Sequence, residues 1–446
     1  MRSRAVSLPR RPALGLGSTA RAPTWLAPAI GTFVGVLSMG RLMLRSWRAP
    51  IDILWAEDGL HALCADRHGF VACLVEPYAG FLHVVPRSLG WIVSWVPIES
   101  WPIAANVGAA LAVGCLAAIV CRILLTVGYD AESAGWLAAV PVLTPGVGLE
   151  SVNSYANLYV PLAYCAAVAL VAVWHHDDRR LVSRAGILAS LAAASIPTAL
   201  LLVVAWWWMI IRRRLKVRPL LPMLGASGFT AAAQIVAIFG ASPRRGYEGS
   251  AAATLATVHL AAATVVASVP GTGSGLADDV PGPFLRSAEW ALLLLGLLGA
   301  ACVLAIAKRV APWSHLGWTV LLGFVFTTVP SLVSGPALRY LNWFGIAISA
   351  AVVAGAIQVA SRHWRRAVIL AAICLWAPWL PASVDRVPSD QQWAAYLNRA
   401  LTDCSGLRGE TTAIEFSPNW PFPHSPVGGR STNVVDCEYL RGATGR

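Results

Sequence analysis

Residues Trp25 to Leu44 have the sequence WLAPAIGTFVGVLSMGRLML, and Ile51 to Leu63, which follow shortly after, have the sequence IDILWAEDGLHAL. The first stretch is apolar over about 20 residues, the length that an α-helix needs to cross a bilayer. Arginines and no acidic residue precede it. This pattern predicts an uncleaved signal anchor, with residues 1–24 as a basic cytoplasmic tail.

The composition extends this prediction to the whole chain of 446 residues. Hydrophobic residues make up 57% and charged residues 13%, about half the usual share of charge, and the mean hydropathy is +0.62. These values exclude a peripheral or single-pass protein and predict an all-α polytopic membrane protein with about eleven transmembrane helices. After the first span, the apolar runs lie near 100–125, 134–149, 156–174, 184–195, 198–211, 219–240, 288–307, 315–333, 341–360 and 367–381.

The basic residues set the expected orientation. Connections rich in arginine and lysine lie at 175–184, 212–218, 308–309 and 362–366, and such connections are usually cytoplasmic. The net charge of +12 is therefore mainly an orientation signal, and no nucleic-acid partner is expected. The predicted domains are the tail 1–24, a transmembrane bundle 25–381 with outer loops 45–100 and 241–288, and a small extracytoplasmic C-terminal tail 382–446.

This orientation gives a first testable prediction. Tags placed at Lys216, Lys308 and Arg365 should be accessible only from the cytoplasm, because each lies in an arginine-rich connection. Tags near Gly275 and at the C-terminus should be accessible only from outside. Accessibility labelling of intact cells checks both, and a cytoplasmic C-terminus would contradict the odd number of spans.

Several enzyme classes are excluded. The chain has no Gly-Lys-Ser/Thr phosphate loop, no His-Glu-x-x-His zinc motif and no Gly-x-Ser-x-Gly elbow. Its predicted inner connections are too short to build a cytoplasmic nucleotide-sugar domain. The Asp177 and Asp178 pair in one of them is interpreted as a solvated turn.

The cysteines outside the predicted spans fall into two pairs. Cys64 and Cys73 share the first outer loop, and Cys404 and Cys437 share the tail. An oxidising exterior would allow each pair to form a disulfide, while buried free thiols are the alternative.

The adjacent carboxylates of Glu57 and Asp58 are the strongest candidates for chemistry. Two neighbouring acids at a membrane surface repel each other and lose hydration, which raises the pKa of one unless a cation compensates, and a raised pKa suits a general base. In the alternative, the pair only stabilises the start of a helix and His61 packs beside it.

With these features the sequence resembles the GT-C class of polytopic glycosyltransferases. The resemblance rests on the cytoplasmic N-terminus, one span and then the acidic pair, on the amphipathic segment Tyr78 to Val96, and on a late outward Arg339-Tyr340. It implies sugar transfer from a polyprenyl-phosphate donor to a glycan or lipid acceptor at the outer face of a bacterial cell membrane. Asp58 is favoured as the base, with Glu57 as its partner or a metal ligand, and a divalent cation is left open.

Substrate contacts are expected from polar residues near the outer face. Arginine suits the departing lipid phosphate because its planar fork donates two parallel hydrogen bonds. The candidate binding residues are Arg339, Tyr340, Arg87, His83, Tyr78, Glu150 and Asn153, with Arg244 and Arg245 as further arginines. The rival hypotheses are a transporter or flippase of lipid-linked substrates and a non-catalytic scaffold for envelope assembly.

Overall fold

The structure is a computed structural model that describes residues 23–45, 50–52, 54, 56–78, 80–143, 153–176, 178–213, 218–240, 350, 393–405, 411–413 and 434–444. Most of these residues are helical. The longer helices are α1 (Leu26–Arg45), α5 (Trp101–Thr126), α6 (Ala131–Leu143), α7 (Tyr159–His175), α8 (Arg179–Ala193), α9 (Leu200–Arg212) and α10 (Leu221–Gly240). The predicted first outer loop contains the outer-loop helices α2 (Ala56–His68), α3 (Phe70–Val75) and α4 (Val84–Val93), with 3-10 turns η1 (Pro50–Asp52) and η2 (Ile98–Ser100). Two further 3-10 turns, η3 (Pro197–Ala199) and η4 (Arg218–Leu220), precede α9 and α10.

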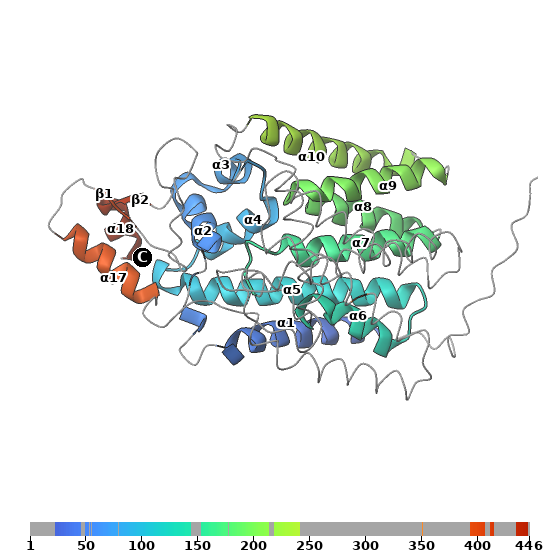
Figure 1. Cartoon of the computed structure of the whole chain (residues 1–446), viewed down its shortest axis with the longest axis horizontal. Helices are drawn as coiled ribbons and strands as arrows, with labels where there is room; N and C mark the ends of the chain where they lie inside the picture. The colour runs from blue at the N-terminus through green and yellow to red at the C-terminus, as the bar shows by residue number, and fades with distance from the viewer. Residues whose placement is uncertain are drawn as a thin grey trace, which may run out of the picture.

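The longer helices lie side by side, and the outer-loop helices gather at one end of them (Figure 1). Helix α1 packs along α5, while α7, α9 and α10 each pack against α8. Helices α2 and α4 pack together over the first turns of α5, which places the acidic pair at the end of the bundle where α5 begins.

Three described helical segments are long and apolar enough to cross a membrane: Leu26–Met43, Ile98–Thr126 and Arg218–Gly240. Large apolar side chains project outward from them, including Phe33 at 65% exposure and Phe239 at 83%. Such a surface suits lipid and would be unusual in water. The protein is therefore a mostly helical membrane protein. The count of eleven spans stays a prediction, because the runs from 288 to 381 lie almost entirely outside the described residues.

Two of the helices at the apolar runs are too short to span a bilayer fully. Helices α8 and α9 have 15 and 13 residues, fewer than the roughly 20 of a full span. They hold each other closely, because Trp206 donates its indole N–H to the carbonyl of Val182 at 2.9 Å and its ring covers Gly186. Asp178 begins α8 as its N-cap, accepting the Arg180 N–H at 2.9 Å, whereas Asp177 lies outside the described residues.

Glycines allow α1 and α5 to approach closely. A Cβ added to Gly114 would lie 2.7 Å from the carbonyl oxygen of Gly31, and one added to Gly31 would lie 2.5 Å from the carbonyl oxygen of Gly114. Backbone atoms on both sides leave no flexible group to move aside. Small residues thus let two backbones meet, as is common between membrane helices.

We expect Gly114→Leu to destabilise the protein by about 1 to 3 kcal/mol, because the new side chain has to force α1 away from α5. Gly108→Leu on the same helix is the matched control, since nothing lies within 4 Å of its added Cβ. Thermal unfolding of the purified variants in detergent measures the difference. Equal melting temperatures for the two variants would contradict the close packing.

The C-terminal tail forms a small unit next to the outer-loop helices (Figure 1). It contains α17 (Trp393–Cys404), the antiparallel strands β1 (Thr411–Ala413) and β2 (Val434–Asp436), and α18 (Cys437–Thr444). A disulfide joins Cys404 to Cys437. The indole of Trp393 stacks on Trp101 and donates its N–H to the carbonyl of Ile98 at 2.8 Å, which anchors the tail to the start of α5.

Candidate functional site

Asp58 lies in the first turn of α2 and is buried, with 2% exposure. Its Oδ1 accepts the hydroxyl of Ser154 at 2.9 Å and the backbone N–H of Ala156 at 2.7 Å. The hydroxyl of Tyr155 donates to the backbone carbonyl of Asp58. The carboxylate therefore connects the outer loop to the segment before α7 (Tyr159–His175), about 100 residues later in the chain. The Glu57 backbone belongs to α2, but its side chain lies outside the described part.

Two histidines and four other aromatic rings pack together near Asp58. His61, one turn after Asp58 on α2, has its ring centroid 5.4 Å from that of His83 and 5.1 Å from that of Tyr78. Phe81 stacks on His83 at 4.5 Å. Tyr155 and Tyr159 lie within 6.4 Å of these imidazoles, centroid to centroid. His61 and His83 are both buried. The structure thus brings Tyr78 and His83 together with Asp58, and adds His61 to them.

Burial, followed by the nearby His83 and Arg87, lowers the pKa of His61 well below its usual value. Its imidazole is therefore neutral in the folded protein, and its Nε2 has no hydrogen-bond partner among the described residues. Burial and the neighbouring Asp58 raise the pKa of the Tyr155 phenol well above its usual value, so this group remains a donor. The cluster presents neutral hydrogen-bonding groups around one buried carboxylate.

The depressed pKa of His61 predicts acid sensitivity. Below a pH of about 6.5 the unfolded chain binds a proton at this residue, whereas the folded chain does not. The contribution of His61 to the free energy of unfolding is therefore complete above that pH. Below it, the free energy of unfolding falls by at most about 1.4 kcal/mol per pH unit. His61→Gln should lose less stability than the wild type between about pH 7.5 and pH 5. Thermal unfolding across this range measures the difference, and parallel curves would contradict the prediction.

Arg87 is buried on the inner face of α4 (Val84–Val93), with 4% exposure. A disulfide joins Cys64 of α2 to Cys73 of α3, and Nη1 of Arg87 lies 2.7 Å from each of the two sulfur atoms. The same nitrogen is 3.8 Å from a carboxylate oxygen of Glu76. Arg87 therefore holds α2, α3 and α4 together, and its Nε has no hydrogen-bond partner in the described part of the chain.

Close packing fixes the distance between α2 and α4. A Cβ added to Gly90 of α4 would lie 2.7 Å from the backbone carbonyl carbon of His61. Gly69 ends α2 with a φ of +76°, a conformation that favours glycine and turns the chain into α3. The position of His61 thus depends on glycines that offer no chemical group of their own.

Asn153 is buried and lies in the left-handed region, with φ of 54°. Its amide donates to the backbone carbonyl and the side-chain oxygen of Asn106 at 2.9 and 3.2 Å, and its own oxygen accepts the Ser38 hydroxyl at 3.2 Å. These contacts join α1 and α5 to the segment before α7, in which Ser154 and Ala156 donate to Asp58. Asn153, predicted from the sequence as a substrate contact, is used here in positioning that segment.

Gln234 of α10 was not identified from the sequence. It is fully buried, accepts the backbone N–H of Leu82 at 2.7 Å and donates to the carbonyl of Ala193 at 2.9 Å. The Ser195 hydroxyl accepts the backbone N–H of Val85 at 3.2 Å. These contacts hold the segment that carries His83. The available signal was a lone amide in an otherwise apolar span, a type of residue that often joins membrane helices.

The remaining predicted site residues lie outside the described residues: Glu150, Arg339, Tyr340, Arg244 and Arg245. In the part of the chain that is described, no group of three or more His, Cys, Asp and Glu side chains is arranged to hold a metal ion. Asp58 already uses one carboxylate oxygen within the protein. The side chain of Glu57, the predicted metal ligand, lies outside the described part, so a divalent cation stays an open prediction.

Comparison with known proteins gives a distant structural likeness. No protein-family model and no curated protein sequence matches the chain. Among solved structures, the chain is similar to the apo form of an oligosaccharyltransferase from Archaeoglobus fulgidus, with a TM-score of 0.45 and 12% sequence identity over 86% of this chain. The match spans 58% of the length of that protein.

Proposed function

We propose that the protein is an integral-membrane glycosyltransferase of the bacterial cell membrane. It transfers a sugar from a polyprenyl-phosphate donor to a glycan or lipid acceptor of the cell envelope on the outer face. The observation that carries this proposal is the convergence of Asp58, His61, His83 and Tyr155 in one buried cluster. This cluster lies at the end of the helices that the arginine pattern predicts to face outward.

The acidic pair supplies the proton acceptor in this proposal. An acceptor hydroxyl loses its proton as its oxygen attacks the anomeric carbon, and the bond from that carbon to the lipid phosphate breaks. Two donors fix the carboxylate of Asp58 in direction, which suits a preorganised base. Glu57, its neighbour, is the partner acid. The Nε2 of His61, which has no hydrogen-bond partner among the described residues, is offered to a substrate hydroxyl or phosphate oxygen at the same place.

The departing lipid phosphate needs a cation. We assign this role first to Arg339, with Tyr340 beside it, because it follows the end of a predicted span on the outer side. Arg87 is the second candidate, because its guanidinium already contacts the Cys64–Cys73 disulfide and Glu76. Arg339→Ala should weaken donor binding and leaving-group stabilisation together. Glu150 is the proposed contact to sugar hydroxyls.

The test is sugar transfer by the purified chain in proteoliposomes. A polyprenyl phosphate carrying a radiolabelled sugar is supplied with an extract of envelope glycans as acceptor, and labelled product is separated from donor by solvent extraction. Transfer that requires the protein supports the proposal. Labelled lipid that is only moved between leaflets, with no product formed, rejects it.

One observation favours the transporter alternative. Arg41 is buried near the end of α1, with 3% exposure, and donates to the carbonyl of Val142 at 2.6 Å. Ionisable groups inside membrane spans are typical of transport pathways. If Arg41→Gln abolishes lipid movement between leaflets in protein that never yields a glycan product, the transporter function replaces the glycosyltransferase.

A further inference from the structure

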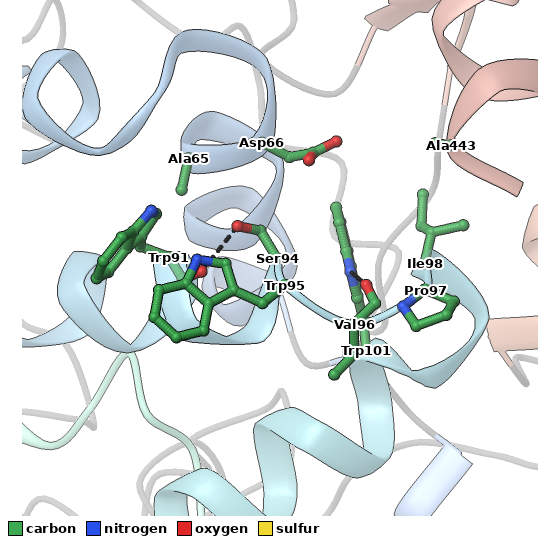
Figure 2. Close-up of a pocket in the computed structure, with 10 residues that line it drawn as sticks. All are labelled: Ala65, Asp66, Trp91, Ser94, Trp95, Val96, Pro97, Ile98, Trp101 and Ala443. Atoms are coloured by element: carbon green, nitrogen blue, oxygen red, sulfur yellow. Dashed lines mark hydrogen bonds between the residues drawn. The ribbon is translucent and has the colours of Figure 1, made fainter. Parts of the chain in front are cut away.

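A cavity of about 450 Å³ lies apart from the Asp58 cluster, between α2, α4, the start of α5 and the C-terminal tail (Figure 2). A volume of this size is typical of a small-molecule site. The residues that define its chemistry are Asp66, Trp91, Ser94, Trp95, Trp101 and Ala443. No candidate residue from the sequence falls among them.

The walls of the cavity are aromatic and fixed in place. Trp91 and Trp95 meet edge to face with ring centroids 4.5 Å apart, and Phe70 packs behind Trp91 at 4.5 Å. On the other side, Trp101 donates its indole N–H to the carbonyl of Val96 at 3.1 Å (Figure 2). Trp95 nevertheless remains 66% exposed, so its ring is available to a ligand.

A carboxylate completes the lining. Figure 2 shows Asp66 above the space between the tryptophans on either side. Its carboxylate accepts a hydrogen bond from the hydroxyl of Tyr439 in α18. The Arg67 guanidinium lies over the Tyr439 ring, 6.0 Å from its centroid. A carboxylate has two oxygens with several lone pairs, so it can accept from Tyr439 and from a ligand at the same time. The cavity thus combines exposed indole rings with a hydrogen-bond acceptor.

We propose that this cavity binds a sugar ring of the acceptor, which makes the acceptor a saccharide chain rather than a simple lipid. The C–H face of a sugar ring packs on an indole, and its hydroxyls donate to the carboxylate of Asp66. An acyl chain would offer no donor to this carboxylate while removing its water, which is costly. The inference rests on the proposed function for its identification of the ligand as the acceptor.

The distance to the acidic pair fits this role. Asp66 follows Asp58 by eight residues on the same helix, which places the two about 12 Å apart along the axis at 1.5 Å per residue. A saccharide chain a few rings long covers this distance. The cavity therefore holds one end of the acceptor while the other end reaches Asp58.

The tail contributes to the site, because Ala443 of α18 lines the cavity and Tyr439 contacts Asp66. The disulfide between Cys404 and Cys437 holds α18 beside α17. The tail thus has a role in acceptor binding in addition to its packing on Trp101.

Binding can be measured without transfer. The full chain is placed in lipid nanodiscs free of glycoside detergents, and saturation-transfer NMR records signal passing from aromatic protons to the methyl glycosides of glucose, galactose, mannose and arabinose. We expect at least one sugar to bind, and Trp95→Ala and Asp66→Asn each to weaken its affinity about tenfold. Trp25→Ala, which removes an indole of 64% exposure just before α1 begins, is the matched control and should bind normally.

The outcomes separate the two proposals. Sugar binding that persists in Asp58→Asn and is lost in Trp95→Ala supports the cavity even where no transfer is detected. Equal binding by Trp95→Ala and Trp25→Ala, or no signal from all four sugars, overturns the cavity while leaving Asp58 untouched. Labelling of residues 91–101 by a diazirine fatty acid, unaffected by added sugar, overturns it in favour of lipid.

Discussion

Asp58→Asn is expected to reduce sugar transfer by about 10² to 10⁴ while donor binding survives. The asparagine oxygen can still accept the Ser154 hydroxyl and the Ala156 N–H, so the local structure is retained. What is lost is the negative charge that receives the proton of the acceptor hydroxyl. Initial rates and donor affinity in proteoliposomes, measured on the same preparation, separate these effects.

Two further variants separate the loss of the Asp58 charge from the loss of its hydrogen bonds. Ser154→Ala removes one donor to Asp58 and leaves its charge, so its effect on transfer should be much smaller than that of Asp58→Asn. Asp58→Ala should additionally lower the melting temperature, because the N–H of Ala156 then loses its acceptor in a buried place. Full turnover by the Asp58→Asn and Glu57→Gln double variant would reject catalysis by the acidic pair.

Removing the tail disulfide is expected to cost about 3 to 4 kcal/mol of local stability. The bond joins Cys404 to Cys437 across a sequence separation of 33 residues, and opening it restores the conformational entropy of that loop to the unfolded tail. The Cys404→Ser and Cys437→Ser double variant should lose hydrogen-exchange protection in α17 and α18. Helices α1 and α5, which pack without the tail, should change little.

Cys115→Ser is the matched control for loss of a cysteine, because this thiol is free, exposed and distant from the tail in sequence. Its exchange pattern should equal that of the wild type. Unchanged protection of α17 and α18 in the double variant would show that the packing of Trp393 on Trp101 suffices to hold the tail.

Much of the fold follows from local patterns in the sequence. The apolar runs near 100–125 and 219–240 appear as α5 and α10, because a helix in lipid satisfies its own backbone hydrogen bonds. The amphipathic segment from Tyr78 to Val96 appears as α4 with Arg87 on its buried face. The helix boundaries and exact span lengths were predicted less accurately, because the helix predicted to begin at 184 begins at Arg179.

The sequence by itself determined a polytopic helical membrane protein, its expected orientation and the prominence of Asp58, because hydropathy, arginine bias and adjacent carboxylates are properties of neighbouring residues. Only the tertiary structure decided which residues from distant parts of the chain contact each other. Gln234 contacts Leu82, Asn153 contacts Asn106, and Tyr439 contacts Asp66 across long separations in the chain. Such contacts depend on helix packing set by small residues such as Gly90 and Gly114, and the sequence pattern does not encode which faces come together.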